Sequence, residues 1–350
     1  MAASPRTART VRRRNRRYLT LVVLVLALAG GWMALWNYAA KTAEDTIAGW
    51  RAREAKAGRT YTCGAQSIGG FPFRIEVLCD RAVAVLRALQ PPVELKASNI
   101  HIAAQIYQPT LLISEFTGPL TVAEPGRPPG FIANWKLAQS SVRGAPAAPE
   151  RVSIVFDNPT LDRVGPAESI LKARRIEIHG RLAEGSAANR PVVEIVLQLA
   201  KFSAPAAGAL AVAPIDADIA GVLRGLADFS PKPWSVRFRE MQAAGGRIEI
   251  GKARVQQGDT LAVGSGSLTI NAGGRLDGQI DLTVAGLEGF INAVLAASQQ
   301  KAGFGLTLGL GLLGGNRTLE GRPAIALPLR VADGTLFLGP IKLGEVPALF

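Results

Sequence analysis

Histidine and cysteine are scarce in this chain, with two of each among 350 residues. The histidines, His101 and His179, both fall on the polar side of a segment in which apolar residues alternate. The sequence contains no HExxH pattern, no GxSxG pattern and no cluster of cysteines. Zinc sites and serine-hydrolase elbows need such ligands or nucleophiles at fixed spacings. We therefore predict no catalytic residue, no metal and no cofactor.

Two glycine-rich stretches come close to nucleotide-binding motifs, and both fail. Residues 246–253 (GRIEIGKA) are one residue short of a P-loop, and Ala253 stands where a magnesium-binding hydroxyl belongs. Residues 309–314 (GLGLLG) match GxGxxG, but Gly315 and then Pro323 follow where a dinucleotide site needs a helix. Neither stretch predicts nucleotide binding.

Acidic residues are absent before Glu44, whereas seven arginines lie in the first 17 residues. These arginines supply more than half of the formal net charge of +13, so the rest of the chain is only mildly basic. A nucleic-acid-binding protein needs a basic surface on its folded part. We therefore predict no nucleic-acid partner.

Charged residues of either sign are missing between Tyr18 and Ala40. As a helix, Tyr18 to Trp36 would rise about 28 Å, close to the ~30 Å hydrocarbon core of a bilayer. Arginines precede this stretch, and an excess of positive charge marks the cytoplasmic side of a span. We predict a cytoplasmic tail (1–17), a transmembrane signal anchor (18–38) and a periplasmic body, in a single-pass protein of the bacterial inner membrane.

A cleaved signal peptide is the alternative for this stretch. Ala27-Leu28-Ala29 has the small-x-small form of a cleavage site. Against cleavage after Ala29, the apolar stretch continues through Trp32 and Trp36. Both readings stay open at this point.

The hydrophobic period changes after the anchor. Residues 39–60 keep a helical period and predict a stalk, and period-two alternation then begins at Phe71. Alternation of this kind predicts half-buried strands. It recurs around 93–106, 152–157, 176–178, 193–199, 234–238, 248–250, 280–284 and 325–331. We predict a mainly β body (β-rich α+β) of antiparallel sheet, interrupted by helices at 216–228 and 287–300.

Two stretches rich in alanine and proline, 143–149 and 203–214, resemble linkers or long loops. We accordingly divide the body into an N-terminal β-rich region, 61–202, and a C-terminal β-rich region with helices, 203–350. The sequence leaves open whether the two regions form one sheet.

One predicted strand near the C-terminus has a face nearly without side chains. Its large residues alternate with glycines, and we predict a hydrophobic groove formed by Phe304, Leu306, Leu308, Gly309, Leu310 and Gly311. A glycine face lets an acyl chain or another backbone approach closely. Close packing of a strand or helix is the alternative.

The two cysteines, Cys63 and Cys79, are close in sequence and would be exported together. Cysteines in an oxidising compartment are usually bridged. Gly69 and Gly70 offer a turn between them, and antiparallel pairing would bring the flanking segments within disulfide reach. We predict a structural disulfide, with a redox pair or a metal ligand as alternatives.

Two motifs resemble an uncharacterised proteobacterial family of single-span, periplasm-facing envelope proteins. The first motif follows Tyr61-Thr62-Cys63 and contains Gly69, Gly70, Phe71, Pro72, Phe73 and Arg74. The second is the ending Asp333 to Gly344. The β-rich body also looks distantly similar to AsmA-type proteins, which are implicated in envelope lipid homeostasis. This resemblance implies an envelope protein and brings no activity with it.

Taken together, these features predict a non-enzymatic, membrane-anchored periplasmic protein that binds lipid or another hydrophobic envelope component. The alternative is a scaffold or assembly factor that binds envelope proteins through sheet edges or the predicted 287–300 helix. The third hypothesis is an exported hydrolase.

Overall fold

The computed structural model describes residues 7–145, 148–165, 168–186, 190–207, 212–229, 232–286, 316–338 and 341–350. It begins with one long helix, α1 (Thr7–Lys56). Within α1, the part from Tyr18 onward has a stretch with mean hydropathy 2.2, long and apolar enough to cross a membrane. Its leucines are uncovered, with Leu19 and Leu28 65% and 66% exposed. An apolar helix left bare by the rest of the protein is typical of a membrane anchor or a signal sequence.

In the described ranges twenty strands follow the helix, and all their pairings are antiparallel. The first ten are β1 (Arg59–Thr62), β2 (Ala65–Gly69), β3 (Arg74–Leu86), β4 (Val93–Gln105), β5 (Gln108–Ala123), β6 (Phe131–Asn134), β7 (Leu137–Arg143), β8 (Arg151–Asp157), β9 (Thr160–Arg163) and β10 (Glu168–Lys172). The others are β11 (Arg175–Leu182), β12 (Val193–Phe202), β13 (Ile215–Arg224), β14 (Arg247–Gln257), β15 (Thr260–Ile270), β16 (Leu276–Ala285), β17 (Asn316–Leu319), β18 (Arg322–Ala332), β19 (Thr335–Leu338) and β20 (Ile341–Glu345). The body is thus mainly β, as predicted.

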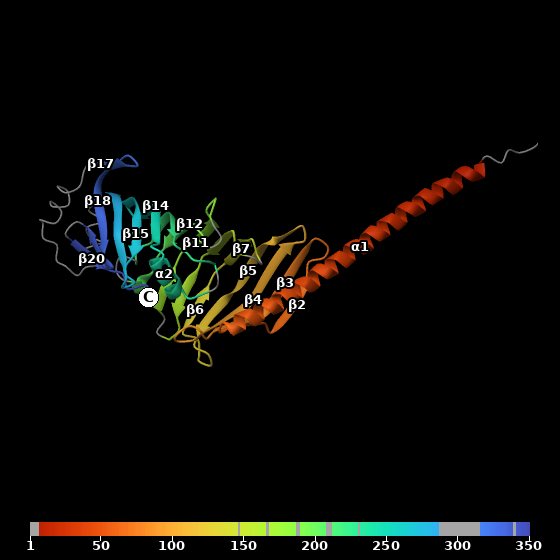
Figure 1. Ribbon diagram of the computed structural model, residues 1–350, viewed down its shortest axis with the longest axis horizontal. Coiled ribbons are helices and arrows are strands. Elements are labelled where there is room, and N and C mark those ends of the chain that lie inside the picture. Colours follow the sequence, from red (N-terminus) through yellow and green to blue (C-terminus); the bar gives the residue numbers. More distant parts are fainter. Residues whose placement is uncertain are drawn as a thin grey trace, which may run out of the picture.

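The strands form one sheet that follows the chain order closely. The main row runs β3–β4–β5–β7–β8–β11–β12–β13–β14–β15–β16–β18–β19–β20. Short strands join its borders: β1 and β2 pair with β3, β6 links β5 to β9, β10 pairs with β9, and β17 pairs with β18. In Figure 1 the strands lie side by side from β2 and β3 near the helix to β18 and β20 at the far end.

The sheet continues across the division made from the sequence at 202/203. β12 and β13 pair directly, with Leu197 opposite Ile219. The stretch between them contains the short 3-10 helix η1 (Pro205–Ala207). The other linker-like stretch joins β7 to β8, which are neighbours in the sheet. The described parts of both β regions therefore belong to one sheet.

Two elements differ from those expected. The apolar alternation at 234–238 predicts a strand, but the structure has the helix α2 (Trp234–Ala243), preceded by Pro233 and followed by Gly245. Three alternating residues in so short a window fit either period, and proline directly before the segment favours a helix start.

The helix expected at 216–228 is also wrong, because β13 occupies Ile215–Arg224. Asp216 and Asp218 are residue types that favour a helix start. Instead they lie on a strand and form ion pairs across it, Asp216 with Lys201 at 2.7 Å and Asp218 with Lys252 at 3.2 Å. The predicted helix at 287–300 and the glycine-faced strand at 304–311 lie outside the described residues.

The buried core is concentrated at the C-terminal end of the sheet. One cluster joins Val284, Leu327 and Leu338, and a second joins Leu261, Ala285 and Ala324. A third places α2 against the sheet through Met241, which is fully buried. The strands from β3 to β12 contribute only Ala82 and Ala138 to the buried hydrophobic residues of the described chain.

Candidate functional site

One face of the sheet is apolar across almost its whole length. Directly opposed residues of neighbouring strands point to the same face, so the register can be followed from strand to strand. The central row runs Val77, Ile102, Ser114, Ser140, Ile154, Ile178, Leu197, Ile219, Ala253, Gly264, Leu282, Leu327.

The rows on either side of the central row have the same character. One runs Cys79, Ile100, Phe116, Ala138, Phe156, Ile176, Leu199, Ala217, Val255, Ala262, Val284, Ile325. The other runs Ile75, Ala104, Leu112, Val142, Val152, Gly180, Ile195, Gly221, Ile250, Gly266, Ile280, Leu329. We call these three rows the apolar face. It carries no charged side chain.

The opposite face, which we call the polar face, holds the residues between these rows. It is cross-linked by ion pairs, including Arg181–Glu194 at 2.5 Å and Arg254–Glu320 at 2.9 Å. Both histidines lie on it, His101 beside Glu76 and His179 beside Glu177. Charged groups that stay in contact with water lose little hydration free energy when the protein folds. The polar face therefore behaves as a solvated surface.

Electrostatics on the polar face come from pairs within and between strands. The hydrogen bond donated by Arg175 lowers the pKa of the Glu177 carboxyl, and a hydrogen bond from His179 acts in the same direction. No group of three or more histidine, cysteine or acidic residues within the described ranges is placed to hold a metal ion.

The apolar face is open over the first half of the sheet. From β3 to β12 its large side chains are only half-buried, and Ile178 at the centre of β11 is 39% exposed. A methyl group added at Gly180 would meet no heavy atom within 4 Å. This stretch crosses six strand-to-strand steps of the main row, or roughly 29 Å at about 4.8 Å per step. A single acyl chain spans half of a bilayer core, or roughly 15 Å.

The Trp135 side chain narrows this open stretch, and α2 covers part of the sheet beyond it. The Trp135 ring packs edge-on against Phe156, with 5.8 Å between ring centroids, and Trp135 Nε1 donates a hydrogen bond to the Phe116 carbonyl oxygen. Farther along the sheet, α2 packs Met241 and Phe238 against Leu223 and Ile248. The apolar face is therefore open near α1 and covered at one border near α2.

Helix α1 packs on the other end of the sheet. Trp50 stacks on Tyr61 of β1 at 4.7 Å between ring centroids. The Glu54 carboxylate, which is 7% exposed, receives hydrogen bonds from Arg59 Nε at 2.5 Å and Nη2 at 3.0 Å. This bidentate pair raises the pKa of the Arg59 guanidinium and holds the last turns of α1 to β1.

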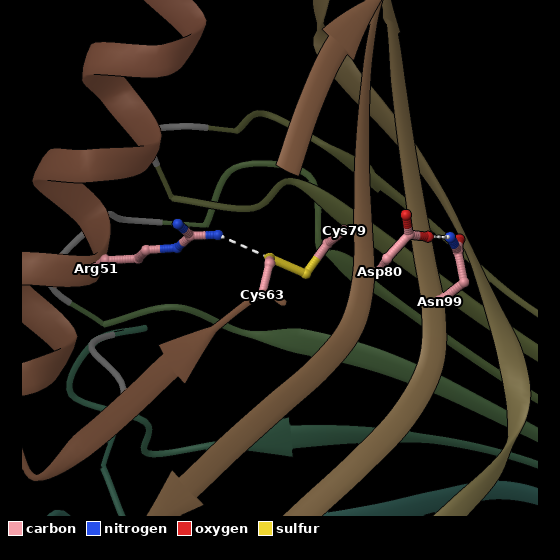
Figure 2. Close-up of a disulfide and its surroundings, with 5 residues drawn as sticks. All are labelled: Arg51, Cys63, Cys79, Asp80 and Asn99. Carbon is pink, nitrogen blue, oxygen red and sulfur yellow. Dashed lines mark hydrogen bonds between the residues drawn. A yellow bond between two sulfur atoms is a disulfide. The ribbon is translucent and has the colours of Figure 1, made fainter. Parts of the chain in front are cut away.

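A disulfide joins Cys63 and Cys79 at the same place, with 5.3 Å between their Cα atoms. Gln66 of β2 lies opposite Cys79, and Cys63 sits where the chain passes from β1 to β2. Figure 2 shows Arg51 reaching from α1 to the bridge, where its Nη2 donates to Cys63 Sγ at 3.1 Å. On the far side of the bridge, Asn99 of β4 donates to the Asp80 carboxylate of β3. The disulfide is therefore part of the junction between α1 and the sheet.

The glycine–phenylalanine motif at 69–74 forms a turn. Phe71 and Phe73 were expected to begin a strand, but β3 begins at Arg74. Phe71 and Phe73 instead contact α1, with ring centroids 5.7 Å from Trp36 and 6.2 Å from Trp32, respectively. The groove residues predicted at 304–311 lie outside the described residues, so the apolar face is a different site from the one the sequence suggested.

Comparison with known proteins places the chain in a family. Residues 36–347 match a family of uncharacterised proteins conserved in bacteria, DUF2125. The chain belongs to DUF2125. The matched part of this DUF2125 member begins at Trp36, near the Phe71 turn, and includes the whole apolar face. Comparisons with curated proteins and with solved structures give no match.

Proposed function

We propose that this DUF2125 protein binds the acyl chains of a lipid, or another hydrophobic component of the bacterial envelope, on its apolar face. The supporting observation is the run of uncharged positions from Val77 to Leu327, half-buried in the strands nearest α1. Exposed apolar patches larger than a few hundred Å² on soluble domains mark binding surfaces. Covering about 300 Å² of such a surface contributes roughly 7 kcal/mol before the costs of association.

The proposed binding is non-enzymatic, and the proposed location is the periplasmic side of the inner membrane. The arginine-rich tail would stay in the cytoplasm, α1 would cross the membrane once, and the sheet would be exported. The distant resemblance to AsmA-type proteins, which are implicated in envelope lipid homeostasis, points to the same compartment and ligand class.

Lipid analysis of the full chain tests the binding. The protein is purified in mild detergent, and native mass spectrometry is combined with extraction and identification of co-purified lipid. We expect one or more acyl lipids in stoichiometric amount. A lipid-free protein that co-purifies with a defined protein partner would contradict the proposal and favour an envelope scaffold.

Reporter fusions test the location. Alkaline phosphatase fused after Phe350 should be active, because it folds only after export, and a fluorescent protein that fails to mature in the periplasm should stay dark there. The reverse pattern would refute the proposed topology. Sequencing of the mature N-terminus separates an intact anchor from cleavage after Ala29.

A further inference from the structure

Aromatic side chains project from two hairpin tips beside α1. The turn between β2 and β3 carries Phe71 and Phe73, which are 51% and 63% exposed, and the turn between β4 and β5 carries Tyr107, 72% exposed. The tips adjoin, because Ile106 N–H donates to the Phe73 carbonyl oxygen at 3.1 Å. Exposed apolar side chains that gather in one place, unlike scattered single ones, mark a site of interaction with another surface.

The first tip is fixed against the apolar part of α1. Trp32 Nε1 donates to the Pro72 carbonyl oxygen at 2.8 Å, and Trp36 Nε1 donates to the Arg74 carbonyl oxygen at 2.9 Å. These two hydrogen bonds and the ring contacts with Phe73 and Phe71 hold the tip at one level along the helix. In Figure 1 β2 and β3 lie beside the C-terminal half of α1, and its N-terminal half extends beyond the sheet.

This level coincides with the end of the apolar stretch. If the span starts at Tyr18, its hydrocarbon part ends about 30 Å farther on, close to Tyr38. Trp36 then lies at the boundary, and Trp32 lies about 6 Å deeper, at 1.5 Å per residue. The Phe71–Phe73 turn is held between these depths, whereas the first charged residue after the span is Lys41.

We propose that the β2–β3 and β4–β5 tips insert into the outer leaflet of the same membrane that α1 crosses. Tyrosine is favoured at the boundary between headgroups and acyl chains, where its ring is buried and its hydroxyl stays hydrated, and the apolar ring of phenylalanine is favoured on the lipid-facing side of interfacial segments. The occupant of this surface is lipid, because the tip is attached to the membrane-spanning helix at the depth of the leaflet. The inference rests on the anchoring in the proposed function and is independent of ligand binding by the apolar face.

Insertion at these tips would place one end of the apolar face at the bilayer surface. β3 begins at Arg74, directly after the inserted turn, and Ile75 is the first apolar-face residue of that strand. The Arg74 and Glu76 side chains pair at 2.5 Å on the polar face, at the level expected for lipid headgroups.

Depth measurement with spin labels tests the proposal. The native cysteines are bridged to each other, so an added cysteine is the one free thiol. Tyr107→Cys and Phe73→Cys variants of the full chain are spin-labelled at the new cysteine and reconstituted into vesicles of phosphatidylethanolamine and phosphatidylglycerol. Collisions with oxygen and with a water-soluble nickel complex then report lipid and water exposure. Leu89→Cys is the matched control, because Leu89 is 41% exposed on the turn at the other end of β3.

The label at both tip positions should lose accessibility to the nickel complex and gain accessibility to oxygen relative to the label at Leu89. A label at Leu26, on the apolar part of α1, verifies the anchor. If the Leu26 label is in lipid and the tip labels are as exposed to nickel as the Leu89 label, tip insertion is refuted and the anchor stands. If the Leu26 label is also in water, the anchor itself is refuted and the inference with it.

Discussion

Replacing Ile178 by glutamate introduces a charge at the centre of the open apolar face. Ile178 lies in β11 between Ile154 of β8 and Leu197 of β12, and it is 39% exposed. The surrounding apolar-face positions carry no charged group that could pair with the new carboxylate. The substitution therefore changes the proposed binding surface while leaving the backbone register in place.

The expected cost to folding is modest. Complete burial of an isoleucine side chain contributes about 1.5–3 kcal/mol, and Ile178 is roughly three-fifths buried, so its loss should lower the free energy of unfolding by about 1–2 kcal/mol. This is a fraction of the 5–15 kcal/mol typical of native domains. The effect on a bound acyl chain should be larger, because burying an unpaired carboxylate against hydrocarbon costs several kcal/mol.

The assay compares denaturant unfolding with lipid retention in the purified full chain. Ser141→Glu is the matched control, because Ser141 pairs with Ile113 and Ser153 on the polar face. We expect both variants to unfold cooperatively and only Ile178→Glu to lose its lipid. Equal lipid content in Ile178→Glu and the wild type would refute the reasoning.

Other expected outcomes concern the fold. Reduction of the disulfide should lower the free energy of unfolding by about 3 kcal/mol, the value for a loop of about 15 residues; unchanged unfolding midpoints with and without reductant would argue against it. Gly266→Ala should destabilise the sheet because a Cβ there overlaps a cross-strand carbonyl group, whereas Gly180→Ala on the same face should be tolerated; equal melting temperatures would contradict this. The hydrogen bond from Arg175 lowers the pKa of Glu177, so its stabilisation is complete above the unfolded-state pKa and is lost as pH falls through the lowered, folded-state pKa. Glu177→Gln should therefore weaken the acid dependence of the unfolding midpoint, and an identical pH profile would disprove the link.

Local patterns in the sequence predicted β3, β4, β8, β11, β12, β14, β16 and β18, but they missed other long strands of the sheet, such as β5, β13 and β15. Alternation at Ile100 and Ile102, or at Ile154 and Phe156, indicates which side of each strand is apolar, and the structure has strands at both places. The same short-range pattern was misleading at Trp234 to Phe238, where α2 forms. The helix predicted from Asp216 and Asp218 failed for another reason. The lysines that pair with these aspartates lie on the neighbouring strands β12 and β14, outside the short stretch of sequence from which the helix was predicted.

The apolar face as a whole could not be predicted from local patterns. Its continuity depends on the register of each strand pair, and a shift of one residue would move a strand's apolar side to the opposite face. The contacts of Trp32 and Trp36 with the Phe71–Phe73 turn are likewise long-range, separated by about 40 residues in the sequence. The sequence predicts these two tryptophans only as part of the apolar span, because their partners in the sheet leave no local signal.

Site-specific photo-crosslinking along β12 tests the account most directly. Ile195, Val196 and Leu197 are consecutive aliphatic residues that are all half-buried, but Ile195 and Leu197 lie on the apolar face and Val196 lies on the polar face. Each is replaced in turn by a photoreactive phenylalanine analogue in the full chain, and lipid adducts are measured after illumination in cells. If lipid lies on the apolar face, adducts form at 195 and 197 and none form at 196. Equal adducts at all three positions, or none at 195 and 197, would contradict lipid binding by the apolar face.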